Sequence, residues 1–224
     1  MSPPLDIKCG PLLRYVSTDY RGKKGPLALY TILIVTKDGD SVCDPEPLLE
    51  IAGLNTAKNA PATKLKAEIL HQERTVTFWR WKIYVNLIAD ERRLAYRING
   101  SRENLGFWVP GARQPMRIVF YSCNGTSVDG IVNSPGFSQS VNPDHFLGPD
   151  SLWRDVLRKH GDSPMHVMLG GGDQLYCDGL AKHSKLFRAW LRISNLHHKF
   201  STPYTEELKN EVEEFYLEQY SLVS

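Results

Sequence analysis

The stretch that decides the fold of the first half of the chain is TVTFWRWKIYV, residues 75–85. Apolar and polar residues roughly alternate in it, and alternate side chains of a β-strand point to opposite faces. The stretch therefore predicts a strand with one face in a core. Similar runs within residues 26–36 and 65–98, separated by Gly- and Pro-containing turns, predict an antiparallel β-sandwich over roughly residues 8–112. Trp79 and Trp81 share one face and are expected in its core, although an exposed pair could hold a carbohydrate ring.

The second half of the chain, from residue 113 on, has a different pattern. Two short apolar runs, 116–121 and 165–169, are typical of strands buried on both faces. Between them, residues 151–161 have helical apolar spacing and end on a glycine. Strand, helix and strand in this order predict a right-handed crossover and a parallel strand pair.

Two parallel strands are too few for a stable α/β core. Either they join the N-terminal sheet, or the chain stops before its domain is complete, and we favour the second interpretation. The predicted fold is therefore mixed α+β, with an incomplete domain over residues 113–224 that ends in helices near 184–196 and 205–220. Apolar side chains meant for missing elements should then be exposed, and the candidates are Ile118, Phe120, Val167, Leu169, Leu208, Val212, Phe215 and Tyr216.

Composition excludes several classes of protein. With 42% hydrophobic and 23% charged residues, the chain of 224 residues is typical of a soluble globular protein. A net charge of +2 gives no nucleic-acid signature. Four scattered cysteines without a CxxC pair argue against a disulfide scaffold and a zinc ribbon. No signal peptide or membrane span is recognisable, because the longest apolar stretch falls well short of the ~20 residues that a membrane helix needs; we expect a cytoplasmic location.

Candidate metal ligands follow the two predicted parallel strands. Functional groups gather at the carboxyl ends of such strands, and here the side chains of Cys123, Asp173 and Tyr176 could converge. Three anionic ligands suit a trivalent cation, so ferric iron is the predicted ion. The second carboxylate oxygen of Asp173 is free to bridge to another metal.

The same residues carry a family resemblance. The motifs FYSCNG at 120–125 and GGDQLYCD at 171–178, with WRDVL at 153–157 between them, resemble those of PhoD-like phosphatases, members of the calcineurin-like metallophosphoesterase superfamily. The Gly-Gly-Asp-Gln variant is similar to the fungal branch. The resemblance implies a β-sandwich ahead of an αββα metallophosphoesterase domain. It also implies that Cys123 and Tyr176 bind Fe³⁺ and that Asp173 bridges Fe³⁺ to a second ion, Ca²⁺ in the best-known form.

The activity that the resemblance implies is metal-dependent hydrolysis of a phosphate ester. Two ions would clamp the phosphoryl oxygens and activate a water molecule, and Asn124 and Asp178, beside the ligands, could support them. The family completes its site with a Trp-Asp-Asp-His-like segment that residues 1–224 do not contain. We therefore expect an N-terminal portion with only the iron half of the site, inactive alone. The alternative is a non-catalytic protein- or carbohydrate-binding sandwich with a phosphatase remnant.

Overall fold

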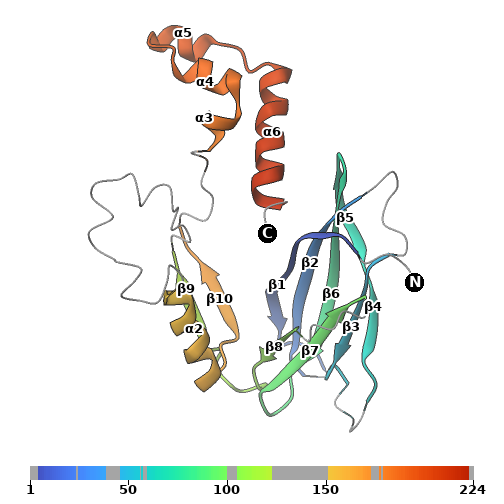
Figure 1. Cartoon of the computed structure of the whole chain (residues 1–224). Helices are drawn as coiled ribbons and strands as arrows, with labels where there is room; N and C mark the ends of the chain where they lie inside the picture. The colour runs from blue at the N-terminus through green and yellow to red at the C-terminus, as the bar shows by residue number, and fades with distance from the viewer. Residues whose placement is uncertain are drawn as a thin grey trace. The chain divides into compact units, whose positions relative to one another are not determined.

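The computed structural model of the chain describes residues 5–23, 25–38, 46–55, 57, 60–99, 105–122, 151–172, 177 and 179–221 (Figure 1). The chain forms two compact units. One contains Met1–Ala89, Arg93–Phe107 and Cys177–Ser224, and the other contains Asp90–Arg92 and Trp108–Tyr176.

In the described part of the first half, strands form two four-stranded sheets. The first has the order β1 (Ile7–Asp19), β2 (Leu27–Lys37), β6 (Val76–Asn86), β5 (Glu68–Glu73), and all its neighbouring pairs are antiparallel. The second has the order β4 (Thr63–Lys66), β3 (Leu48–Ala52), β7 (Arg92–Ile98), β8 (Leu105–Val109), with β3 antiparallel to both of its neighbours. The prediction of antiparallel sheets is confirmed.

The core lies between these two sheets. Along β6, Trp79, Trp81 and Ile83 are fully buried on one face, whereas Lys82 and Tyr84 on the other are exposed. This alternation is the one that the sequence pattern predicted, and it arises because successive side chains of a strand point to opposite faces.

Contacts across the core show that the sheets pack face to face. The rings of Tyr30 on β2 and Phe107 on β8 lie 4.8 Å apart, centroid to centroid. The indole Nε1–H of Trp81 on β6 donates to the carbonyl of Leu65 on β4, at 3.1 Å. Each contact joins a strand of one sheet to a strand of the other, as in a sandwich.

The tryptophan pair on β6 is part of this core. Trp79 and Trp81 are each 1% exposed, and Trp79 Nε1–H donates to the Thr36 hydroxyl at 2.9 Å. Neither ring can stack on a sugar from this position, so the idea that an exposed pair holds a carbohydrate is wrong. The two tryptophans lie in the core because it buries their apolar indole faces and also provides a hydrogen-bond acceptor for each indole N–H.

The second unit contains the parallel pair that the sequence predicted. Strand β9 (Ile118–Tyr121), helix α2 (Ser151–Asp162) and strand β10 (Val167–Gly170) occur in this order, and β9 and β10 form a two-stranded parallel sheet. Val167 lies opposite Ile118, and Gly170 lies opposite Tyr121. The described parts of β9 and β10 pair only with each other, and not with the N-terminal sheets.

The two faces of this small sheet differ. Ile118, Phe120 and Leu169 are 55%, 69% and 48% exposed, which confirms the exposure expected of them, while Val167 is half-buried. Tyr121 points to the opposite face, where its ring contacts that of Trp153 on α2 at 5.3 Å.

The helices described after β10 are α3 (Leu180–His183), α4 (Lys185–Leu191), α5 (Leu196–Ser201) and α6 (Glu206–Ser221). The prediction of a single helix near residues 184–196 is wrong, because α4 ends at Leu191 and a new helix begins after Asn195. The Asn195 side chain accepts a hydrogen bond from the His198 N–H at 3.0 Å. Asparagine favours such a cap over a helix interior, which explains the break.

Helix α6 corrects one expected exposure. Phe215 is 6% exposed, because its ring packs beside that of His183 on α3, with centroids 5.5 Å apart, and against Gly179. Leu208, Val212 and Tyr216 are half-buried. None of the helices in the described residues is long and apolar enough to cross a membrane.

Candidate functional site

The carboxyl ends of β9 and β10 lie side by side. Beyond the last paired residues, the Gly171 N–H donates to the Tyr121 carbonyl at 2.6 Å, and the Ser122 hydroxyl donates to the Gly172 carbonyl at 3.0 Å. Ser122 immediately precedes Cys123 in the sequence, and Gly172 immediately precedes Asp173. The two segments that carry the predicted metal ligands therefore leave the sheet from neighbouring positions.

Glycine at position 171 permits this approach. A Cβ atom there would lie 2.6 Å from the Phe120 ring and 3.2 Å from the Tyr121 carbonyl oxygen. The exposed ring could move away, but the backbone carbonyl is held by its hydrogen bond to Gly171. A side chain at this position would thus push the two strand ends apart.

The predicted ligands themselves, Cys123, Asp173 and Tyr176, lie outside the described residues, as do the two predicted supporting residues, Asn124 and Asp178. Their convergence stays a prediction. Among the residues that the structure describes, no group of three or more His, Cys, Asp or Glu side chains is placed to hold a metal ion.

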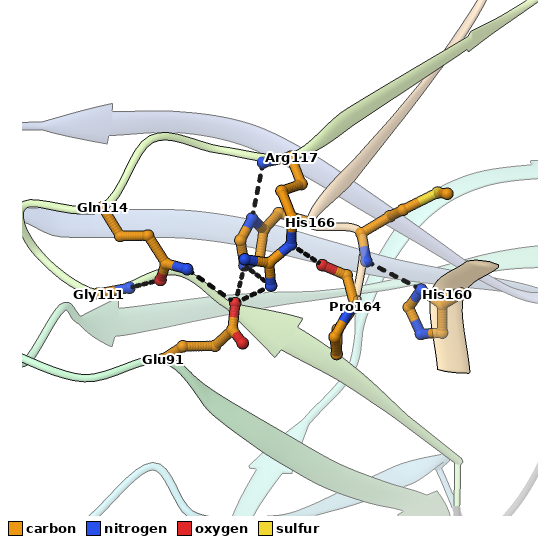
Figure 2. Close-up of polar contacts among 8 residues, drawn as sticks. Glu91, Gly111, Gln114, Arg117, His160, Pro164 and His166 are labelled. Atoms are coloured by element: carbon orange, nitrogen blue, oxygen red, sulfur yellow. Dashed lines mark hydrogen bonds and ion pairs between the residues drawn. The ribbon is translucent and has the colours of Figure 1, made fainter. Parts of the chain in front are cut away.

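At the opposite, amino ends of the strands lies a polar network that sequence reasoning missed (Figure 2). His166 directly precedes β10 and Arg117 directly precedes β9. Their backbones are joined by the His166 N–H, which donates to the Arg117 carbonyl at 2.9 Å. One carboxylate oxygen, Oε2 of Glu91, accepts from His166 Nε2 at 2.6 Å, from Gln114 Nε2 at 3.2 Å and from Arg117 Nη2.

The network assigns a single tautomer to His166. Its Nδ1 accepts from the Arg117 backbone N–H at 2.9 Å, so this nitrogen carries no proton, and Nε2–H donates to Glu91 (Figure 2). The His166 side chain is fully buried. Burial lowers the pKa of His166 below its usual value, and the hydrogen bond to Glu91 opposes this only in part.

The carboxyl of Glu91 is held in its charged form. Partial burial acts to raise the pKa of Glu91, but hydrogen bonds from His166 and Arg117 outweigh burial, so the pKa lies below its usual value. Arg117 is further fixed by its Nε–H, which donates to the Pro164 carbonyl at 2.5 Å.

This network has a structural rather than a catalytic geometry. Both ring nitrogens of His166 are used inside the protein, and the buried ring has no free nitrogen for a substrate or a metal ion. What the network does is hold the first residues of β9 and β10 in one register. No local signal in the sequence connects residues 91 and 166, since 75 positions separate them.

Comparison with known proteins finds a family model that matches the second half. Residues 114–223 match the family model described as PhoD related phosphatase. The matched stretch includes β9, α2 and β10, and at family level it is related to hydrolases that act on phosphate esters. This agrees with the class that the two motifs predicted.

One relative extends the similarity over almost the whole chain. An uncharacterized protein of Saccharomyces cerevisiae is 30% identical over 222 residues, which are 97% of this chain and 30% of that protein. The chain thus spans about 30% of the length of this relative. No solved structure matches the chain.

Proposed function

We propose that residues 113–224 supply part of a metal centre for phosphoester hydrolysis, with ligands that follow β9 and β10. The observation that supports this most directly is the hydrogen bond from the Ser122 hydroxyl to the Gly172 carbonyl. It joins the residues just before Cys123 and Asp173, within the stretch that matches the phosphatase family. Two candidate ligands distant in sequence thereby start from one edge of the sheet, as functional groups of parallel sheets do.

The donor types fit the ions that we propose. Cys123, Asp173 and Tyr176 would hold Fe³⁺, because thiolate, carboxylate and phenolate are all anionic donors. The second oxygen of Asp173 would be shared with a divalent ion, Ca²⁺ in our proposal, and Asn124 and Asp178 would orient these ligands. Two such ions, when bound, supply electrostatic stabilisation of phosphoryl oxygens and a water molecule of lowered pKa.

Residues of the described chain would position this centre. The network of Glu91, Arg117 and His166 holds the amino ends of the two strands, and the bonds at Tyr121 and Ser122 hold the carboxyl ends. A parallel pair fixed at both ends cannot slip in register. A slip of one residue would move one candidate ligand by roughly 3.3 Å relative to the other, which is more than a coordination bond tolerates.

We propose that the functional division lies near residue 112, with the sandwich over residues 8–112 and the phosphatase segment over 113–224. The rival hypothesis, a sandwich that serves only as a protein-binding module, has no observation in its favour among the described contacts. Burial of Trp79 and Trp81 removes the specific motive for a carbohydrate-binding module.

Iron binding tests the ligand set. A phenolate bound to Fe³⁺ gives a visible charge-transfer band, so the chain loaded with Fe³⁺ should be coloured. Tyr176→Phe should abolish the colour, since it removes only the phenolic oxygen, and Tyr204→Phe is the matched control at an exposed tyrosine. A colourless wild type, or colour that survives Tyr176→Phe, would contradict the proposed set.

Phosphate binding and turnover test the function itself. Inorganic phosphate added to the iron-loaded chain should shift the visible band, because a phosphoryl oxygen would enter the coordination shell. With Fe³⁺ and Ca²⁺ present, any hydrolysis of a generic phosphate ester should be lost in Asp173→Asn. A band that does not respond to phosphate, or hydrolysis that is unchanged by Asp173→Asn, would overturn the proposal.

A further inference from the structure

The helical segment over residues 179–205 has a one-sided charge. It contains Lys182, Lys185, Arg188, Arg192 and Lys199 but no aspartate or glutamate. Among the described residues, none of these five side chains forms an ion pair with a carboxylate. Arg188 and Lys199 donate to backbone carbonyls, and the other three are exposed. The segment therefore carries positive side chains without ion pairs in the described residues. One carboxylate from outside it, Glu211 on α6, reaches its edge, where it accepts from the Ser184 hydroxyl at 2.5 Å and from the Leu186 N–H at 3.4 Å.

Large apolar side chains project from the same segment. On α5, Leu196 and Phe200 are 66% and 82% exposed, and their spacing of four residues puts them on one face of the helix. Tyr204, in the connection to α6, is 62% exposed. Single exposed apolar residues are ordinary, but three large ones within nine residues of a basic segment are not.

A groove of about 380 Å³ continues the apolar surface inward. Its lining includes Phe187, Trp190, Phe200, Tyr204 and Lys199. The rings of Phe187 and Trp190 stack at 5.5 Å, and the Lys199 ammonium lies 4.6 Å from the centroid of the Trp190 ring. This contact holds the charge of Lys199 at the border of the aromatic surface.

We propose that α4, α5 and the connection to α6 dock on an anionic membrane surface. Leu196, Phe200 and Tyr204 would enter the boundary between headgroups and acyl chains. Lys185 and Arg192 would contact the anionic headgroups. Aromatic and aliphatic side chains on one face, with Lys and Arg around them, are the composition of interfacial helices. The inference concerns this surface alone and does not depend on the proposed phosphatase activity.

The geometry favours a membrane over an acidic peptide. A peptide held in the groove would leave Leu196 uncovered, because this 66% exposed side chain is not part of the groove lining, whereas a membrane surface would cover Leu196 and Phe200 together. Residues 179–205 contain no acidic residue, and the acidic side chains nearest in sequence, Glu206 and Glu207, belong to α6 and not to the proposed membrane-facing helices α4 and α5. A protein partner would need charges complementary to these basic residues only where the two surfaces touch.

Vesicle binding tests the proposal. The chain should co-sediment with vesicles of equal parts phosphatidylcholine and phosphatidylserine, bind pure phosphatidylcholine vesicles far less, and be released by added salt. Lys185→Gln should weaken vesicle binding about fivefold. The double variant Lys185→Gln with Arg192→Gln should weaken it about 25-fold, because each basic residue near such a surface contributes a similar free energy. Phe200→Ser should weaken binding about tenfold through lost apolar burial.

Matched controls lie on the turn between β1 and β2. Lys23→Gln and Tyr20→Ser remove an exposed lysine and an exposed aromatic ring there and should leave vesicle binding unchanged. Circular dichroism confirms that each variant is folded. Equal binding to both vesicle types, an absence of binding to either, or an equal loss in the control variants would overturn the proposal. An acidic protein as the true partner would produce the second of these results.

Discussion

Replacement of His166 by asparagine should remove a pH dependence of the stability of the protein. In the native fold the buried imidazole is neutral, since its Nδ1 accepts the Arg117 N–H. Asparagine can offer an amide oxygen near the position of Nδ1, but it has no group that reaches Glu91. At about pH 7.5 the variant should lose about 1–3 kcal/mol of unfolding free energy, the usual cost of leaving a buried polar partner unpaired.

The sign of the pH effect follows from the lowered pKa of His166. The usual value is 6.5, so below it the unfolded chain takes up a proton that the folded chain does not. The contribution of His166 to the free energy of unfolding is fully present above pH 6.5 and falls as the pH drops toward the lowered pKa. The loss cannot exceed about 1.4 kcal/mol for each pH unit below 6.5. Glu91, with a pKa below its usual 4.5, adds a similar loss only in stronger acid.

Urea unfolding followed by tryptophan fluorescence, at about pH 7.5 and about pH 5.5, separates the two contributions. The wild type should lose stability between these conditions, and His166→Asn should lose much less. His197→Asn, at an exposed histidine, is the matched control and should behave as the wild type. A wild type of equal stability at both pH values, or a His166→Asn variant that keeps the full pH difference, would refute the reasoning.

Three further predictions, tested with four substitutions, concern packing and helix capping. Trp81→Ala should cost about 3–5 kcal/mol in urea unfolding, because the ring is fully buried between the sheets; a loss below 1 kcal/mol would contradict the core assignment. Asn195→Ala should cost about 1 kcal/mol of local stability, seen as faster amide exchange in α5, since it removes the cap; unchanged exchange would refute this. Gly171→Ala should destabilise by about 1 kcal/mol through crowding at the Tyr121 carbonyl, whereas Gly161→Ala, where a Cβ meets nothing, should stabilise α2; equal effects would argue against the close approach.

Local patterns predicted much of the secondary structure because they report local physics. Alternation in residues 75–85 placed Trp79, Trp81 and Ile83 on one buried face, as found. The helix over 151–161 and the two flanking strands were also predicted and are observed with small shifts at their ends. The pattern failed near residues 184–196, where apolar spacing continues past the Asn195 cap. A single capping hydrogen bond outweighed the periodicity there.

The sequence by itself pointed to the family whose model matches residues 114–223, because the motifs around Cys123 and Asp173 are contiguous runs. Only the tertiary structure decided which distant residues meet. The three donors on Glu91 come from positions 114, 117 and 166, and Ser122 meets Gly172. Such contacts depend on the parallel pairing of β9 with β10, which joins segments about 50 residues apart. The strand–helix–strand order predicted that these strands pair, but not their register, because the backbone hydrogen bonds that form the pair are nearly the same for all residues except proline.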